Sequence, residues 1–195
     1  MKLKIYKIIF IILIITLIIL FGKIISKTIE NHNYDIENHK TVEAFSEITQ
    51  KGENEEVLLQ GYKVIGIVNI PKINIEYPIL DINTYNPEET KAPMKISIVK
   101  YWGGNVNDYG NLSIAGHNNY DGTMFGKTKK LEEGDIIELT DLQNIKIQYK
   151  IYSKFVTDPN DVTILESNNY ESREVTLITC TNGNKNRLIL KAKEI

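Results

Sequence analysis

The single cysteine of this chain, Cys180, directly follows a short apolar run that ends in a turn signal. The run at residues 175–178 consists of β-branched and apolar residues, which are typical of a strand, and residues 181–184, Thr-Asn-Gly-Asn, indicate a turn. We therefore expect Cys180 to lie near the end of a strand. A thiol in such a place becomes a nucleophile when a neighbouring cation favours its thiolate, whereas a lone cysteine in a strand is more often a small buried hydrophobic residue.

A cation follows on the far side of this turn. A second strand-like run, residues 187–190, begins with Arg187, one of only two arginines in the chain. The spacing predicts a hairpin-like pair in which Cys180 and Arg187 face each other. A guanidinium there can activate the thiol and stabilise an oxyanion, although Arg187 could also simply cover an apolar edge with its stem. The other arginine, Arg173, lies in the polar stretch 168–174, and we interpret it as a solvated charge.

Nucleophilic chemistry also needs a base, and the chain contains three histidines. His32 and His39 lie in a polar segment near the N-terminus, and neither has clustered ligands beside it for a metal site. His117 instead follows residues 111–116, a short strand-like run that ends in glycine, so it alone is positioned by a scaffold. Imidazole often transfers protons in enzymes, while a histidine after a strand-ending glycine also commonly has a structural role.

The order of these motifs resembles that of a known family. The sequence Thr-Leu-Ile-Thr-Cys ends at Cys180, Arg187 follows it, and Ala-Gly-His ends upstream at His117; this set resembles the sortases of Gram-positive bacteria. Residues 66–73 are similar to the entry strands of that family, so the resemblance covers roughly residue 57 to the C-terminus. It implies a mainly β fold, a closed eight-stranded β-barrel with one or two short helices, preceded by an N-terminal transmembrane helix.

The resemblance also implies the activity of a membrane-anchored cysteine transpeptidase. Cys180 would attack a peptide bond in the C-terminal sorting signal of a surface protein and form a thioacyl-enzyme. His117 would protonate the leaving amine and later assist the incoming amine, and Arg187 would hold the substrate carbonyl or the developing oxyanion. The acyl group would pass to an amine of a cell-wall peptidoglycan precursor or of a pilin, and we expect neither a cofactor nor a metal.

Two other functions stay open at this point. A cysteine peptidase or amidase with the same dyad would hydrolyse its thioester without an acceptor. A non-catalytic surface module would keep the barrel and the anchor but would have no need for a reactive thiol. The sortase class is open as well, because residues 116–125 resemble class B members, whereas the short segment 156–175 lacks the helix inserted there, and class D members match about as well.

Short strand patterns fill the chain from about residue 57. Residues 145–156 contain a stretch that alternates strictly between apolar and polar side chains, and Asn86 followed by Pro87 has the signature of a helix start. A loop with a brief helix is expected over residues 122–131. Other strand-like runs lie at residues 62–70, 73–77, 96–99, 112–115, 135–139 and 162–165. Many short strands with little helix favour a closed or nearly closed barrel, which leaves no exposed edge.

The N-terminus has the pattern of a membrane anchor. Lys2, Lys4 and Lys7 precede an apolar run at residues 8–21. A helix over residues 5–25 is about 30 Å long at about 1.5 Å per residue, enough to cross the hydrocarbon core. No Ala-x-Ala-like cleavage site follows, so we expect an uncleaved signal anchor rather than a cleaved signal peptide. The lysines should lie on the cytoplasmic side and the rest of the chain outside.

These patterns divide the chain into three regions. Residues 1–25 are expected to form a cytoplasmic tip and the transmembrane signal anchor, residues 26–56 an extracellular polar stalk, and residues 57–195 the catalytic β-barrel domain. Apolar residues at helical spacing indicate a short helix over residues 41–50, so the stalk is expected to be partly helical.

The amino-acid composition limits which other functions the chain could have. The chain has 195 residues, of which 42% are hydrophobic, which suits one domain of ordinary size with an appendage. The formal net charge is -2 and the lysines are scattered, so nothing indicates a nucleic-acid-binding surface. One cysteine excludes an intramolecular disulfide. Glu132, Glu133 and Asp135 are interpreted as a solvated turn rather than a metal site.

Overall fold

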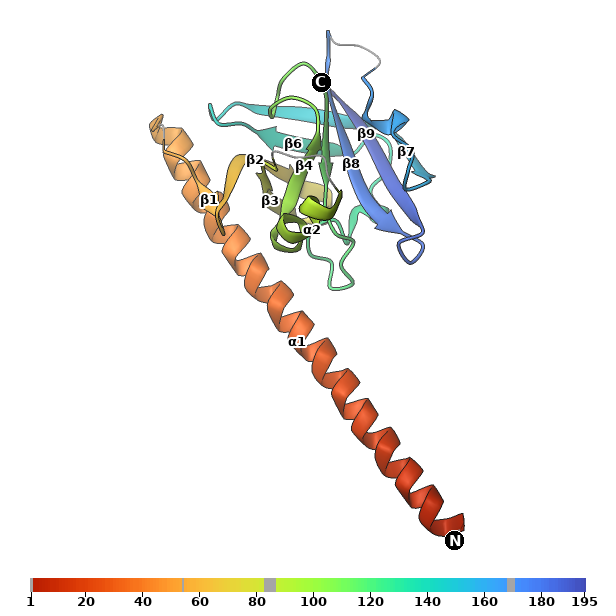
Figure 1. Cartoon of the computed structure of the whole chain (residues 1–195). Helices are drawn as coiled ribbons and strands as arrows, with labels where there is room; N and C mark the ends of the chain where they lie inside the picture. The colour runs from red at the N-terminus through yellow and green to blue at the C-terminus, as the bar shows by residue number, and fades with distance from the viewer. Residues whose placement is uncertain (1, 54, 83–86, 168–170) are drawn as a thin grey trace. The chain divides into compact units, whose positions relative to one another are not determined.

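The computed structural model describes residues 2–53, 55–82, 87–167 and 171–195. The chain forms two compact units, Met1–Asp35 and Ile36–Ile195. The described part of the first unit is helical, and the strands belong to the second (Figure 1).

Eight strands of the second unit close a β-barrel. They are β2 (Tyr62–Ile70), β3 (Ile75–Leu80), β4 (Ile98–Trp102), β5 (Gly110–Ala115), β6 (Ile136–Thr140), β7 (Lys146–Thr157), β8 (Arg173–Thr181) and β9 (Asn186–Glu194), and the two-residue strand β1 (Leu58–Leu59) pairs with β2. Their order is β1-β2-β3-β4-β5-β8-β9-β7-β6, and a further pairing of β2 with β6 closes the ring with β1 outside it. β3 pairs with β4, and β5 with β8, in parallel, and the other neighbours are antiparallel. The predicted closed barrel is confirmed.

Short helical elements connect the strands. They are α2 (Pro87–Ile96) and the 3-10 turns η1 (Pro71–Ile73), η2 (Thr128–Lys130) and η3 (Thr163–Leu165). The helix start predicted at Pro87 is confirmed, and its expected cap, Asn86, lies outside the described residues. The brief helix expected within residues 122–131 is η2.

The strand predicted over residues 162–165 is wrong, because this stretch forms η3. The carboxylate of Asp161 accepts hydrogen bonds at Oδ1 from the N–H of Thr163 at 3.0 Å and from its hydroxyl at 2.6 Å. Such bonds between an aspartate and the backbone two residues later turn the chain and compete with strand pairing. The apolar residues on either side of Thr163 obscured this signal.

Side-chain alternation along β8 and β9 decides which residues enter the barrel. Leu177 on β8 and Leu190 on β9 are register partners and both belong to the buried core. Successive residues of a strand point to opposite faces. Cys180, which follows Leu177 by an odd number of positions, and Arg187, which likewise precedes Leu190, therefore lie on the outer face of the barrel.

The helix α1 (Lys2–Lys51) begins in the first unit. Its apolar run at residues 8–21 is solvent-exposed in the protein alone. Among the described residues, α1 is the helix that is long and apolar enough to cross a membrane. Exposed isoleucine and leucine side chains at this density are favoured in hydrocarbon and not in water, so this segment fits a membrane anchor.

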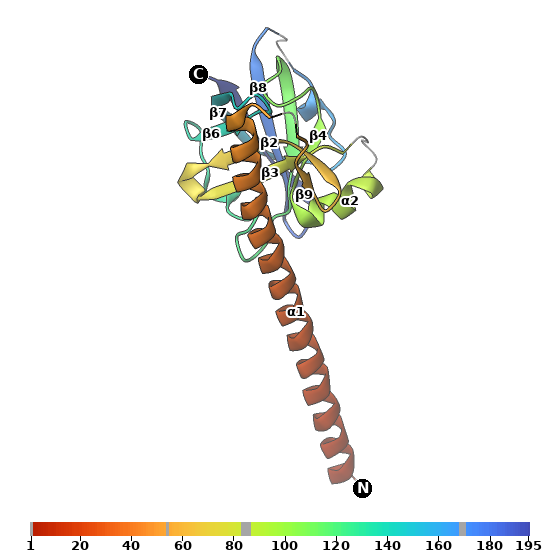
Figure 2. The same cartoon turned by 90° about the vertical axis from the view of Figure 1, so that its left-hand side faces the viewer.

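The C-terminal part of α1, residues 36–51, belongs to the second unit. Phe45 is fully buried and lines one hollow together with Val57 and Val64. Figure 2 shows the end of this segment beside β2, as does Figure 1. These residues therefore contribute to the core of the unit that carries the strands.

The compact unit thus begins at Ile36, whereas the sequence predicts a folded domain from residue 57. A hydrogen bond supports the earlier start, because the side chain of Asn38 donates from Nδ2 to the carbonyl oxygen of Ile96 at 2.8 Å. The polar composition of residues 26–56 hides this packing. One buried helix face needs an apolar residue only at every third or fourth position.

Replacement of Phe45 by alanine is expected to lower the free energy of unfolding by about 3–5 kcal/mol, because a buried ring is lost and a cavity remains. Ile36→Ala is the matched control, since Ile36 lies on the same helix but is 42% exposed, and it should change the free energy by less than about 0.5 kcal/mol. Urea unfolding followed by circular dichroism measures both. Equal losses in the two variants would contradict the burial of Phe45 in the folded unit.

Candidate active site

Cys180 and Arg187 are register partners on the antiparallel strands β8 and β9. Directly opposite residues of such a pair project from the same face, with Cβ atoms about 4.5–5.5 Å apart. The thiol and the guanidinium therefore leave the barrel wall side by side, and both residues are half-buried. The expectation that they face each other is confirmed. The thiolate is the nucleophilic form of cysteine, and Arg187 provides a positive charge on the same face of the pair.

The guanidinium of Arg187 is oriented by backbone carbonyl groups. Its Nη1 donates to the carbonyl oxygen of Asn184, in the turn before β9, at 3.3 Å and to that of Asn186, the first residue of β9, at 3.2 Å. None of the ion pairs among the described residues includes Arg187. Neutral carbonyl partners hold the group in place without cancelling its charge, so the charge can act on an anion at the outer face.

His117 lies just past the end of β5, in a segment that is bonded to β8. The N–H of Gly116 donates to the carbonyl oxygen of Ile178 at 3.1 Å. The hydroxyl of Thr179 donates to the carbonyl oxygen of Gly116 at 2.7 Å, and this bond is buried. The backbone immediately before His117 is therefore held beside the strand that carries Cys180.

Asn118 holds the same segment on the other side of His117. Its Nδ2 donates to the carbonyl oxygen of Cys180 at 2.8 Å. Neither Asn118 nor Thr179 is singled out by the sequence patterns. The signal that could have found them is adjacency, because each directly neighbours a candidate catalytic residue and has a side chain that can bond to backbone groups.

The loop after His117 is held by its own hydrogen bonds. The carbonyl oxygen of His117 accepts from the N–H of Phe125 at 3.0 Å. The carboxylate of Asp121 accepts at Oδ1 from the N–H and the hydroxyl of Thr123 at 3.0 and 2.6 Å, and Nδ2 of Asn119 donates to the same hydroxyl oxygen at 2.9 Å. This internal bonding gives the loop a defined geometry where it leaves His117.

A second turn borders the site on the side of β7. Thr157 is the register partner of Arg187 on β7, and its hydroxyl donates to Oδ2 of Asp161 at 2.6 Å. Hydrogen bonds from the hydroxyl of Thr157 and then from that of Thr163 lower the pKa of the Asp161 carboxyl, because both stabilise the carboxylate form. The turn after β7 is thus tied to the strand next to Arg187.

Comparison with known families agrees with this geometry. The sortase domain model matches residues 68–195, well over half of the chain.

The chain belongs to the sortase family.

Individual relatives support the assignment. Sortase A of Bacillus anthracis is 30% identical to this sortase over 201 residues, which covers 95% of this chain and 91% of that protein. A solved Clostridium perfringens sortase D5 transpeptidase superposes with a TM-score of 0.62 at 30% identity, covering 83% of this chain and 97% of that one. Sortase C of Clostridium perfringens, solved with the C-terminal cell wall sorting motif, has a TM-score of 0.57 at 21% identity and covers 84% and 90% of the two chains; this likeness shows the fold alone.

Family membership confirms the predicted function. Sortases are cysteine transpeptidases, and this sortase is an enzyme of that type. Nothing in the comparisons favours a hydrolytic peptidase or a non-catalytic module. The relatives carry the names of different classes, so the class B-like or class D-like assignment stays a prediction, as do the roles of Cys180, His117 and Arg187.

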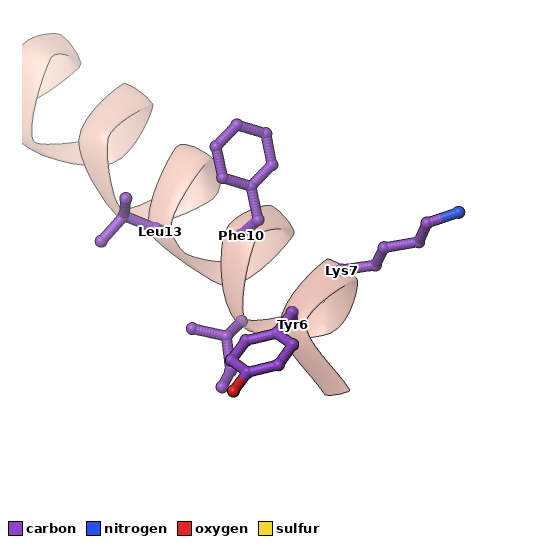
Figure 3. A pocket seen from close by; sticks show the side chains of 5 residues that line it. Tyr6, Lys7, Phe10 and Leu13 are labelled. Carbon is purple, nitrogen blue, oxygen red and sulfur yellow. The ribbon is translucent and has the colours of Figure 1, made fainter. Parts of the chain in front are cut away.

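A concave surface on α1 is formed by residues other than the candidate catalytic residues. It is lined by Tyr6, Lys7, Ile9, Phe10 and Leu13. Figure 3 shows the labelled side chains projecting from successive turns of this one helix. Tyrosine and lysine beside an apolar run are typical of a helix end at a membrane–water interface. This surface of the sortase therefore fits lipid contact better than substrate chemistry.

The acidic turn at residues 132–135 forms an ion pair. Asp135 accepts at Oδ2 from Nζ of Lys72 at 2.8 Å and from the N–H of Glu132 at 2.7 Å. Among the residues that the structure describes, no group of three or more His, Cys, Asp or Glu side chains could hold a metal ion. The expectation that the sortase works without a metal stays a prediction.

Arg173 is not the solvated charge that its sequence context suggests. It begins β8, at the opposite end from Cys180. Its Nη1 lies 2.9 Å from Oε2 of Glu194, its Nε donates to the carbonyl oxygen of Asn107 at 2.6 Å, and its guanidinium lies 4.1 Å from the ring centroid of Tyr109. These partners are distant in the sequence, which is why local context misled. In this sortase Arg173 has a structural role.

Gly116→Ala is expected to disturb the segment that carries His117. A Cβ at Gly116 would lie 2.9 Å from the buried ring of Phe125 and 3.2 Å from the side chain of Ile98. Overpacking of this kind should lower the free energy of unfolding by about 1–3 kcal/mol, and the transfer rate should fall with it. Gly22→Ala is the control, because a Cβ there meets no atom within 4 Å. Unfolding and transfer rates that match the wild type in Gly116→Ala would contradict the close packing.

Proposed function

We propose that this sortase uses Cys180 as its nucleophile, His117 as its general acid and base, and Arg187 as the cation that binds the substrate carbonyl oxygen. The register pairing of Cys180 with Arg187, beside a His117 segment bonded to the same strand, carries the proposal. A cysteine transpeptidase needs a thiol, and the sequence contains one cysteine. His117 is also the one histidine that a barrel strand positions.

In the first half-reaction, the thiolate of Cys180 attacks the carbonyl carbon of the scissile peptide bond. The carbonyl oxygen becomes an oxyanion, which the guanidinium of Arg187 stabilises. The carbon–nitrogen bond then breaks, and charged His117 gives its proton to the leaving amine. The products are a thioester on Sγ of Cys180 and the released C-terminal fragment of the substrate.

In the second half-reaction, an amine attacks the carbonyl carbon of the thioester. Neutral His117 accepts a proton from the incoming amine, the carbon–sulfur bond breaks, and Cys180 returns to the thiolate. A new amide bond joins the substrate to the acceptor. Arg187 faces the same oxyanion in both steps, because the carbonyl oxygen of the acyl group occupies the same place.

The proposed substrate is a surface protein with a C-terminal sorting signal. The outer face carries an exposed apolar side chain near the thiol, because Phe155 of β7 is the register partner of Ile189, on the same face as Arg187, and is 37% exposed. Phe155 can contact apolar residues of the signal. Membership of the sortase family supports this substrate class. We assign the acceptor amine to a peptidoglycan precursor or a pilin.

The anchor is proposed to cross the membrane, with the catalytic unit on the extracellular side. Residues 1–25 form the cytoplasmic tip and the single membrane span, and residues 36–195 form the extracellular catalytic unit. The basic residues at the N-terminus support this orientation, because positive flanks stay in the cytoplasm. The short polar stretch 26–35 joins the two.

Substitutions in the full chain, purified in detergent micelles, test the three roles. Cys180→Ala should abolish thioester formation and turnover. His117→Ala should lower kcat about 10²- to 10⁴-fold, the usual contribution of general acid–base catalysis. Arg187→Lys keeps the charge but loses the planar fork, and it should lower kcat about 10²- to 10³-fold. Mass spectrometry of a sorting-signal peptide library incubated with triglycine measures the transfer product.

Lys185→Gln is the matched control for Arg187, because it removes an exposed positive charge from the same turn. Arg173→Lys is unsuitable, since it would disturb the ion pair with Glu194. Full activity in Arg187→Lys, or an equal loss in Lys185→Gln, would place the oxygen-binding role elsewhere. Release of the free acid without any triglycine adduct would favour the hydrolytic peptidase.

External protease should reach the catalytic unit in intact protoplasts. We expect cleavage after residue 27 while the N-terminal lysines remain protected, because the positive flank holds the N-terminus in the cytoplasm. Immunoblotting with tags at the two ends of the chain measures this. Protection of the C-terminal tag until the membrane is permeabilised would reverse the proposed orientation.

A further inference from the structure

The parallel pairing of β5 with β8 has a constant spacing along its hydrogen bonds. The N–H of Gly110 donates to the carbonyl oxygen of Ser172 at 2.9 Å, and the N–H of Gly116 donates to that of Ile178 at 3.1 Å. Parallel pairs are evenly spaced, so the next acceptor on this side of β8 is the carbonyl oxygen of Cys180. Its backbone donor would be the N–H of residue 118.

β5 ends at Ala115, and the chain then turns away from β8. Asn118 forms an antiparallel bridge with Met124 instead of continuing the strand. Its side chain nevertheless reaches back, because Nδ2 donates to the carbonyl oxygen of Cys180 at 2.8 Å across 62 residues of sequence. A carbonyl can only accept, so the amide nitrogen must face it. The side chain of Asn118 thus takes the place of the missing backbone donor.

This arrangement encloses His117 between two contacts to β8. Gly116 is bonded to Ile178 and to the hydroxyl of Thr179 on one side, and Asn118 is bonded to Cys180 on the other. Without the second contact, the segment after Gly116 would lose its bond to the end of β8. The position of the imidazole relative to the thiol would then be less tightly fixed.

We propose that Asn118 is a positioning residue that sets the separation of His117 and Cys180. The proposal rests on the roles proposed above for those two residues. Asn118 acts through the backbone of Cys180 and does not bind the reacting atoms. A misplacement of catalytic groups by about 1 Å can lower a rate about 10²-fold. The bond of Asn118 is solvent-exposed, so its loss should change folding little.

The test uses the full chain in detergent micelles and two variants, Asn118→Ala and Asn118→Asp. Both remove the donor, and the carboxylate also repels the carbonyl oxygen of Cys180. We expect kcat for peptide transfer to triglycine to fall about 10- to 100-fold in both variants, because misplaced catalytic groups can lower a rate by about 100-fold. The KM for the peptide and the thermal midpoint of unfolding should stay unchanged. Asn69→Ala is the matched control, because it also removes one hydrogen bond donated by an asparagine amide, here to Oε2 of Glu138, but on β2.

A second readout separates positioning from a general structural role. The rate at which iodoacetamide alkylates Cys180, measured against pH, reports the thiolate and its neighbour. The profile of Asn118→Ala should move from that of the wild type toward that of His117→Ala. Wild-type kcat and a wild-type alkylation profile in Asn118→Ala would overturn the inference about Asn118. The proposed function would still stand if Cys180→Ala and His117→Ala were inactive. Retained activity in His117→Ala would instead overturn the proposed function.

Discussion

The pairing of β8 on both of its sides is the constraint on which the site depends. β8 runs parallel to β5 and antiparallel to β9, and its register with each is continuous. A slip of one residue would turn Leu177 out of the core and Cys180 into it. Full burial of a leucine side chain is worth about 1.5–3 kcal/mol, and Leu177 packs with Leu190 across the pair. The outward direction of the thiol is therefore a consequence of core packing.

The two arginines of the chain have different surroundings, and these surroundings suit different roles. Arg173 at the start of β8 is neutralised by Glu194 and stacks on Tyr109. Arg187 at the other end is oriented by backbone carbonyls, which carry no net charge. A charge that is held but not neutralised can stabilise an oxyanion at little cost in reorganisation. The same residue type thus has two different environments at opposite ends of one hairpin, and only that of Arg187 fits the role in catalysis proposed for it.

Closure of the barrel gives the site its support. The pairing of β2 with β6 removes the exposed edges of the sheet, and residues 36–51 of α1 add Phe45 to the buried set. The loops after β5 and β7 are in turn held by aspartate-centred hydrogen bonds. Groups that must act together in a reaction are best carried by elements with few alternative conformations. Here the strands supply the fixed framework, and side-chain hydrogen bonds hold the loops after β5 and β7 in place.

Local patterns were enough for the strand that carries Cys180, the turn after it and the facing of Arg187, because alternation and turn residues act over a few positions. The ordered motifs likewise indicated the family. Local patterns did not predict three features of the structure. These are the partners of Arg173, the inclusion of the helical segment 36–51 in the folded unit, and the contact of Asn118 with Cys180. Each depends on residues brought together from distant parts of the chain. No local pattern specifies which carbonyl lacks a donor at a strand end, since that follows from the register of β5 against β8.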